Sequence, residues 1–200
     1  MLRYLDVQNI LDKNDLILQE SGCVGSENER GNTYMKKIGI VTDSHSSISQ
    51  EEAEKLGIFV LPMPFYIDGE CYYESVTLSR ELFFEKLAAG ADITTSQPSP
   101  TAVMEIWDKA LEQFEKILYM PISSGLSGSY ETAMMLAKDE AYEGRVLVVD
   151  DGQVAAPLHQ MVLDTLDMIE KGYEAEQIRD LLERAGDRMM IYIALQTLEC

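Results

Sequence analysis

The chain alternates short apolar runs with longer segments in which apolar residues recur every three or four positions. The runs predict buried strands, and they cover residues 38–41, 58–67, 117–120 and 146–149. The other segments predict amphipathic helices, which begin near residues 49, 79, 99, 129, 158 and 178. Strands that alternate with helices favour an α/β fold, with a mostly parallel sheet flanked by helices on both faces.

Local signals add detail to the first part of this pattern. Ser49 with Glu52 predicts a capping box at the start of a short helix. Asp68-Gly69 predicts a turn, after which residues 71–73 form the returning strand of a hairpin. The hairpin would follow directly from the long apolar strand at residues 58–67.

Two further helices carry predictions about their buried faces. Ser99 followed by Pro100 predicts a helix start, because proline lacks the N–H group that would stay unpaired there. In that helix we expect Trp107 and Phe114 to lie on one face and to pack in the core. The helix over residues 79–89 is expected to point three apolar side chains inward. These are Leu82, Phe83 and Leu87.

The pattern also predicts how the chain divides. Residues 1–34 differ from the rest of the chain and predict an extension or linker, with Met35 as the native start; a disordered tail is the alternative. Residues 35–172 predict a first α/β domain. Residues 173–200 predict the beginning of a second, incomplete α/β domain, since a strand at 189–195 has only five residues after it. We therefore expect the chain to be truncated at its C-terminus.

Composition excludes some partners. The 200 residues contain 16 Lys and Arg against 35 Asp and Glu, for a formal net charge of −19. Nucleic acids and anionic membrane surfaces are bound through cationic patches, so neither is an expected partner. A module that docks a partner through its acidic surface is compatible with the charge, and it would form a strongly salt-dependent complex.

Cysteine and histidine usage narrows the picture further. The three cysteines lie far apart without CxxC spacing, and the sequence has two histidines, His45 and His159. We expect no disulfide scaffold and no metal site of thiolates or imidazoles, and a reducing cytoplasm fits this usage. No apolar run is long enough for a membrane span, so an integral membrane protein is not expected.

Two hydroxyl-rich turns carry the main candidate chemistry. The first covers residues 94–100 (TTSQPSP) and the second covers residues 123–129 (SSGLSGS), and each precedes a predicted helix. Both would bring hydroxyl groups and backbone N–H groups to one edge of a sheet, where a carboxylate or phosphate is readily held. Helix capping alone is the competing interpretation. Residues expected to support these turns and helix starts are Ser99, Gly125, Ser127 and Gly128.

A serine-dependent hydrolase or acyl transferase is the alternative from a different class. The second turn resembles a nucleophile elbow and offers Ser124 or Ser127 as the nucleophile. However, Ser129 stands where the closing glycine belongs. The general base would have to be His45 or His159.

Aspartates at the ends of predicted strands have two interpretations. Asp43, Asp150 and Asp151 could together bind a metal ion, but loop aspartates at these positions ordinarily accept hydrogen bonds from backbone amides. We favour the second interpretation and expect no metal and no cofactor. The sequence also lacks a P-loop and a complete GxGxxG motif.

Three segments together resemble the signatures of the DegV family. They are residues 37–44 (KIGIVTDS), 94–99 (TTSQPS) and 123–130 (SSGLSGSY), and they occur in the family's order and at similar spacing. The resemblance covers residues 35–200. It implies a two-domain α/β protein that holds one long-chain fatty acid between its domains. It also implies the non-catalytic, lipid-binding subunit of a bacterial fatty acid kinase, which presents the acyl carboxylate to a separate ATP-binding subunit.

The resemblance further implies which residues bind the carboxylate. A threonine of the first turn corresponds to Thr95, with Thr94 and Ser96 beside it, and a serine of the second turn corresponds to Ser124, with Ser123 beside it. Buried methylene groups of the acyl chain would supply the affinity, and the hydroxyl groups would orient the head group.

The chain departs from the family pattern in two places. A basic, glycine-bearing loop would normally follow residues 198–199, and its arginine, which also approaches the carboxylate, is absent from this sequence. Residues 155–159 (AAPLH) replace smaller residues that usually follow the Asp150 turn. The bulk of Leu158 and His159 would reshape the tunnel, so the preferred acyl chain stays open.

Overall fold

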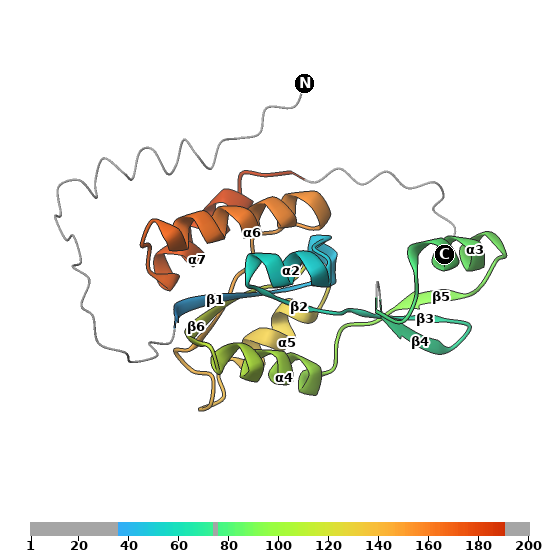
Figure 1. Ribbon diagram of the computed structural model, residues 1–200, viewed down its shortest axis with the longest axis horizontal. Coiled ribbons are helices and arrows are strands. Elements are labelled where there is room, and N and C mark those ends of the chain that lie inside the picture. Colours follow the sequence, from blue (N-terminus) through green and yellow to red (C-terminus); the bar gives the residue numbers. More distant parts are fainter. Residues whose placement is uncertain (1–35, 74–75, 191–200) are drawn as a thin grey trace, which may run out of the picture. The chain divides into compact units, whose positions relative to one another are not determined.

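The computed structural model describes residues 36–73 and 76–190 (Figure 1). The predicted extension over residues 1–34 lies outside the described residues, as does most of the strand predicted at 189–195.

The larger of two sheets is parallel throughout. Its strands are β1 (Lys36–Asp43), β2 (Phe59–Leu61), β6 (Phe114–Met120) and β7 (Val146–Val148), in the order β2-β1-β6-β7. Every neighbouring pair runs parallel, with Val41 opposite Phe59 on one side and Tyr119 on the other. The predicted parallel sheet is therefore confirmed.

Helices cover both faces of this sheet (Figure 1). One face carries α2 (Gln50–Leu56), α6 (Ala155–Glu170) and α7 (Ala175–Gly186), and the other carries α4 (Pro100–Leu111) and α5 (Ser129–Leu136). Between α4 and the sheet, Trp107 and Tyr119 are fully buried, and their rings pack edge to face with centroids 5.4 Å apart. The α/β class predicted from the sequence is confirmed.

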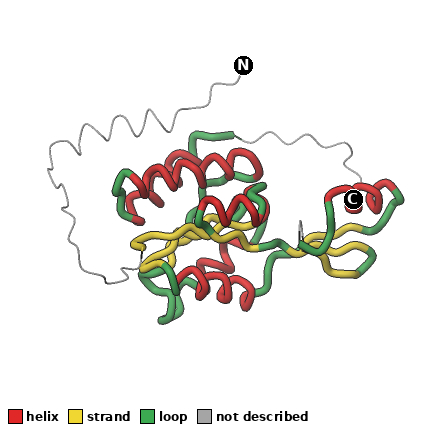
Figure 2. Tube along the Cα trace, viewed as in Figure 1, coloured by secondary structure: helices red, strands yellow, loops and turns green. Residues whose placement is uncertain are grey.

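A second, smaller sheet is antiparallel. It consists of β3 (Pro64–Ile67), β4 (Glu70–Tyr73) and β5 (Ile93–Thr95), in the order β4-β3-β5, with α3 (Arg80–Ala88) between β4 and β5 in sequence. Figure 2 shows these strands as a separate group joined to the large sheet by the chain after β2 and the chain that leads to α4. The hairpin predicted at Asp68-Gly69 is confirmed, because β3 pairs with β4 there.

The prediction of one strand over residues 58–67 is wrong. The run divides into β2 in the large sheet and β3 in the small one. Pro62 and Pro64 flank the break, and proline has no N–H group to continue a ladder.

The helix starts agree with the capping signals in the sequence, whereas the predicted buried faces of α4 and α3 are partly wrong. Ser99 caps α4 by accepting a hydrogen bond from Ala102 N–H, as expected. However, α4 ends at Leu111 and Phe114 opens β6, so the prediction that Phe114 shares a helical face with Trp107 is wrong. Both side chains are buried in the core, as expected.

The predicted inward face of α3 is also wrong in part. Leu82 is 42% exposed and Leu87 is 48% exposed, while Phe83 is half-buried. The described residues thus leave much of the apolar surface of α3 uncovered. Of the capping box predicted for α2, the Ser49 half is confirmed by the hydrogen bond from Glu52 N–H. The Glu52 carboxylate lies 3.2 Å from His159 Nε2 of α6.

Helix α7 packs against β6, β7 and α6, with Ile178 and Leu182 buried. We assigned this helix to the beginning of a second domain, and the structure places it on the first sheet, in one compact unit with the rest of the chain from residue 36. The boundary predicted after residue 172 stays a prediction, because the chain beyond residue 190 is not described.

Candidate ligand-binding site

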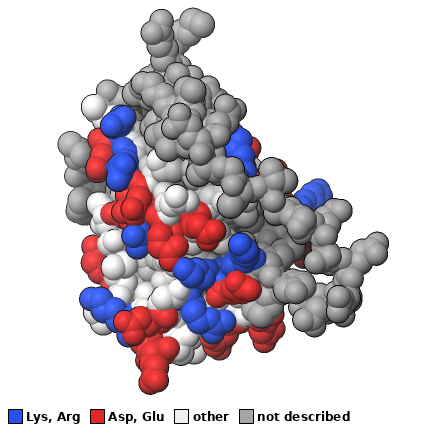
Figure 3. Space-filling view, turned by 90° about the vertical axis from the view of Figure 1, so that its left-hand side faces the viewer, with Lys and Arg blue, Asp and Glu red and all other residues white. Residues whose placement is uncertain are grey.

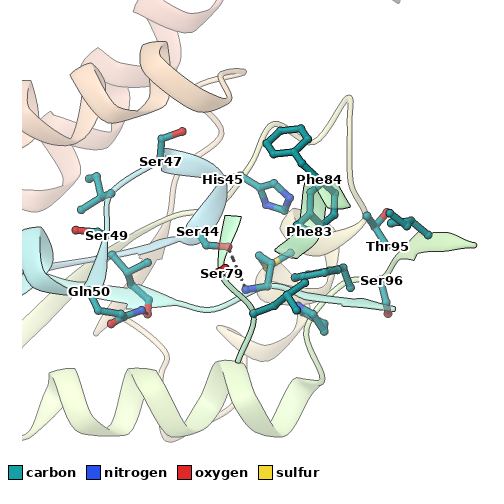
Figure 4. Close-up of a pocket in the computed structure, with 17 residues that line it drawn as sticks. Ser44, His45, Ser47, Ser49, Gln50, Ser79, Phe83, Phe84, Thr95 and Ser96 are labelled. Atoms are coloured by element: carbon teal, nitrogen blue, oxygen red, sulfur yellow. Dashed lines mark hydrogen bonds between the residues drawn. The ribbon is translucent and has the colours of Figure 1, made fainter. Parts of the chain in front are cut away.

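A cavity of about 550 Å³ opens between the carboxyl end of β1 and the small sheet (Figure 4). One wall comes from the 3₁₀ turn η1 (Ser44–Ser46) and the residues up to Gln50, and the other comes from β3, β5 and α3. The volume lies within the range of roughly 300–1,000 Å³ that small-molecule sites occupy.

Most of the cavity wall is apolar. Ile48 and Met63 are buried on the side of the large sheet, while Ile93, Phe83 and Phe84 face the cavity from the small-sheet side. Phe83 and Phe84 pack edge to face, with ring centroids 5.5 Å apart. Such a wall suits an apolar ligand, since burial of its surface would be the main favourable term.

Polar side chains line both walls of the cavity, where Ser47, Ser49, Gln50 and Ser79 accompany four further residues. Ser44 and His45 come from η1, and Thr95 and Ser96 come from the end of β5. Figure 4 shows the His45 ring and the Thr95 side chain beside the two phenylalanines. A wall that combines apolar side chains with hydroxyl groups and an imidazole can hold an amphipathic molecule with a polar head.

The two threonines of the first turn differ in placement. They lie in β5, where successive side chains point to opposite faces of the sheet. Ile93 and Thr95 both line the cavity, so Thr94 between them belongs to the opposite face. Of the three residues predicted from this turn, the structure places Thr95 and Ser96 in the cavity wall.

The second turn follows the carboxyl end of β6. Ser123 is buried, donates its N–H to Gln153 O and accepts a hydrogen bond at Oγ from Gly125 N–H. Ser124 is half-buried, and its N–H donates to Asp150 Oδ1 over 3.3 Å. Ser123 and Ser124 are not among the residues that line the cavity in the described part of the chain.

The two turns nevertheless meet. Thr132 Oγ1 of α5 donates to Gln97 Oε1 over 3.2 Å. A Cβ atom placed on Gly128 would lie 3.4 Å from the same oxygen, so Gln97 also approaches the second turn itself. The structure thus brings the first turn against the helix that follows the second turn. That Thr95 and Ser124 bind one carboxylate stays a prediction.

The supporting residues of both turns have identifiable structural roles. Ser99 caps α4, and Gly128 stands at the N-cap position of α5 without a side chain. Ser127 Oγ lies 2.8 Å from Ser129 Oγ and accepts a hydrogen bond from Ser129 N–H. These contacts hold the turns in shape and account for part of their hydroxyl content.

The nucleophile interpretation gains no support from these contacts. The Ser127 hydroxyl is engaged with Ser129, whereas His159 pairs with Glu52 and His45 Nδ1 lies 3.3 Å from Asp43 Oδ1. The Ser127 hydroxyl is thus engaged within its own turn, whereas these contacts do not test Ser124 as the nucleophile.

The three strand-end aspartates accept hydrogen bonds from backbone amides. Asp43 accepts from His45 and Ile122, and Asp150 accepts from Ser124 and Gly152. Asp151 Oδ1 accepts from Gln153 N–H over 2.9 Å. This is the loop-ordering role that we favoured over metal binding. Among the described residues, no cluster of three His, Cys, Asp or Glu is placed to hold a metal ion.

Asp151 is the most perturbed carboxyl group near the second turn. It is fully buried, and burial raises its pKa to about 7, with smaller contributions from the charges of Asp150 and Asp43. Its Oδ2 atom has no hydrogen-bond partner within the described residues. The folded protein therefore holds a proton on this group at mildly acidic pH.

Sequence reasoning missed most of the cavity wall, because Thr95 and Ser96 are its only members that we predicted as site residues. Ser44 belongs to a motif that we used only for the family resemblance, and we considered His45 only as a general base. Phe83 and Phe84 were not assigned to a site. Two signals in the sequence were available: the alternation of side chains within residues 93–95, and Pro62 within the long apolar run. Neither indicates a cavity until it is known which sheet each strand joins.

One face of the protein carries charged side chains of both signs. Figure 3 shows Lys and Arg side chains interspersed with Asp and Glu on one face. Lys116 of β6 and Glu176 of α7 form an ion pair between these elements. Separately, no helix in the described ranges has the length and hydropathy needed to cross a membrane.

Comparison with known proteins places the chain in a family. The sequence profile described as "Uncharacterised protein, DegV family" matches residues 37–200. A DegV domain-containing protein of Caldanaerobacter subterraneus is 34% identical over 144 residues, which are 72% of this chain and 51% of that protein. The chain thus spans about half the length of this curated relative.

Solved structures agree with the sequence match. A DegV family protein from Thermus thermophilus, described as fatty acid binding, is 33% identical with a TM-score of 0.68 over 76% of this chain and 54% of that one. A Thermotoga maritima protein, described as revealing fatty acid binding function, is 25% identical with a TM-score of 0.65 over 76% of this chain and 55% of that one. By profile, sequence identity and fold, this chain belongs to the DegV family.

Proposed function

We propose that this chain binds one long-chain fatty acid, with the acyl chain in the apolar cavity and the carboxylate at the hydroxyl groups of the two turns. The observation that carries the proposal is the cavity, whose apolar wall includes Thr95 and Ser96 at one edge. Solved members of the family with the same fold are described as fatty acid binding.

The expected binding free energies differ between the acyl tail and the carboxylate head group. Burial of a sixteen-carbon chain at about 0.8 kcal/mol per CH₂ offers on the order of 10 kcal/mol before the costs of association. Each hydrogen bond to a charged oxygen adds roughly 1.5–3 kcal/mol. The tail would therefore supply most of the affinity, and Thr95 with Ser124 would fix the position of the carboxylate.

For the whole protein, the proposal extends to a role in a fatty acid kinase. The chain spans about half of its relatives, and the remainder would complete the lipid tunnel. The protein would be a non-catalytic cytoplasmic subunit that presents the carboxylate to a separate ATP-binding kinase subunit, which forms the acyl phosphate. Neutral hydroxyl groups would leave a carboxylate oxygen less tightly engaged than a lysine would, which suits a group that must attack ATP.

The binding proposal can be tested with two adjacent threonines. In the full-length protein, Thr95→Val should lower the affinity for palmitate roughly tenfold, measured by calorimetry, because one hydrogen bond to a charged oxygen is lost. Thr94→Val is the matched control, since Thr94 lies on the opposite face of β5 and should leave the affinity unchanged. Equal affinities for wild type and both variants would contradict the placement of the head group.

The kinase proposal has a separate test. The full-length protein loaded with palmitate is mixed with a purified ATP-binding kinase subunit of the same bacterium and labelled ATP. Acyl phosphate that forms only when both proteins are present would support the proposal. Formation by the kinase subunit alone, or hydrolysis of an activated ester by the full-length protein alone, would count against it.

A further inference from the structure

We propose that Asp43 is a positioning residue that aligns η1, which lines the cavity, with the second hydroxyl turn. The inference rests on the proposed function and assigns to one buried carboxylate the alignment of η1 with the second hydroxyl turn. Its basis is the set of hydrogen bonds that Asp43 accepts, which join segments far apart in the chain.

Asp43 ends β1 and is fully buried. Its Oδ1 atom accepts a hydrogen bond from His45 N–H over 2.9 Å and lies 3.3 Å from His45 Nδ1. One oxygen of the carboxylate thus holds the backbone of a residue that lines the cavity and lies near its ring.

The other oxygen reaches the neighbouring strand end. Asp43 Oδ2 accepts a hydrogen bond from Ile122 N–H over 2.8 Å, in a buried contact that spans 79 positions of sequence. Ile122 immediately precedes Ser123 and Ser124. The same carboxylate therefore sets where the second turn leaves β6.

The pattern requires two acceptors and no donor. A carboxylate offers two acceptor oxygens, whereas an asparagine amide offers one acceptor and a donor group. In an Asp43→Asn variant, either His45 N–H or Ile122 N–H would face an NH₂ group, and either η1 or the second hydroxyl turn would move. A head group held by Ser124 beside the cavity wall at η1 would then lose alignment, while the apolar wall for the tail would stay in place.

Thr42 provides a matched control. It is the residue before Asp43, is equally buried, and donates its Oγ1 hydrogen to Met120 O over 2.8 Å. Thr42→Val removes this bond between β1 and β6 without change of shape. It should lower stability, but it leaves both amide contacts of Asp43 intact.

The test compares two ligands that differ in the head group. Dissociation constants for palmitate and for hexadecanol are measured on full-length wild type, Asp43→Asn and Thr42→Val. Asp43→Asn should weaken palmitate binding on the order of tenfold and change hexadecanol binding less than about twofold. Thr42→Val should change neither by more than about twofold. Serine is smaller than aspartate and keeps one acceptor. Asp43→Ser should therefore also weaken palmitate binding more than hexadecanol binding.

A second measurement needs no ligand. Hydrogen exchange at the amides of Ile122 and His45 should be faster in Asp43→Asn than in wild type, and unchanged in Thr42→Val. Parallel losses for palmitate and hexadecanol, or unchanged exchange at both amides, would overturn the positioning role. If wild type binds neither ligand, the proposed function fails. The exchange result still decides whether Asp43 holds η1 and the second hydroxyl turn in place.

Discussion

The two sheets of this chain bury their apolar side chains to different degrees. Around the large sheet, Trp107, Ile117 and Tyr119 have no exposed surface. Beside the small sheet, α3 leaves Phe84 51% exposed and Leu87 48% exposed. The large sheet closes its own core with helices on both faces, whereas the small sheet uses its apolar surface as the wall of a cavity. Stability and ligand binding are therefore expected to reside in different parts of the molecule.

The largest effect is expected in the core of the large sheet. Trp107→Ala should lower the free energy of unfolding by about 3–5 kcal/mol, because it leaves a cavity between α4 and β6 where Trp107 packs on Tyr119 and Tyr142. Chemical denaturation followed by circular dichroism measures the loss, because Trp107 is the one tryptophan of this sequence. A loss below about 1 kcal/mol would show that the large sheet is not the stable part of the molecule.

A pH-dependent effect is expected at Asp151. Its pKa of about 7 in the folded protein exceeds the ordinary value near 3.8, so the folded state binds more protons and the contribution to stability falls as pH rises from about 4 to 7. Asp151→Asn keeps the acceptor for Gln153 N–H and removes the buried charge. It should raise the free energy of unfolding by about 2–4 kcal/mol at pH 8 relative to wild type.

The control for Asp151 is the same variant at low pH. At pH 4 the difference between Asp151→Asn and wild type should nearly vanish, because the carboxyl group is protonated in the folded protein. Thermal unfolding across this range measures the difference. A constant difference at all pH values would show that the pKa of Asp151 is the same in the folded and unfolded states.

A close backbone contact predicts a smaller loss. A Cβ atom at Gly186, in the last turn of α7, would clash with the backbone carbonyl group of Asp151. Gly186→Ala should therefore displace α7 from the loop after β7 and cost about 1–3 kcal/mol, although alanine is the better helix former. Arg188→Ala is the control, because Arg188 is exposed and lies just after the helix. Gly57→Ala is unsuitable, because Gly57 has a positive φ that alanine adopts only with strain.

The smallest effect is expected on α3. Phe84→Ser should change the free energy of unfolding by less than about 0.5 kcal/mol, since the ring is half outside the protein. The same variant should weaken palmitate binding, because Phe84 lines the cavity. Denaturation and calorimetry on one sample separate the two results. A large loss of stability without loss of binding would reverse the division proposed between the two sheets.

Local chemistry made part of the fold predictable. Ser99 with Pro100 set the start of α4, and Asp68-Gly69 set the hairpin, because both signals act through neighbouring atoms. The apolar spacing continues from α4 past Leu111 to Phe114, and it led to the wrong prediction that Phe114 belongs to the helix. The spacing cannot show where a helix ends when the strand that follows also buries its apolar residues.

The candidate site was less predictable because it depends on contacts between distant segments. Residue type and spacing do not distinguish Thr94 from Thr95; the family resemblance indicated Thr95, and its place in β5 assigns it to the cavity. The bond between Asp43 and Ile122 joins residues 79 positions apart, without any local signal. Leu87 was expected inside because it is apolar, but its burial requires a partner that the described residues do not supply.

Native mass spectrometry of the full-length protein, purified from a bacterial host, tests the central claim most directly. We predict that wild type retains one long-chain fatty acid and that a Thr95→Val, Ser124→Ala double variant loses it. The Thr94→Val variant should retain the lipid like wild type. A wild-type protein that carries no lipid, and stays empty when palmitate and oleate are offered, would contradict the proposed binding of a fatty acid.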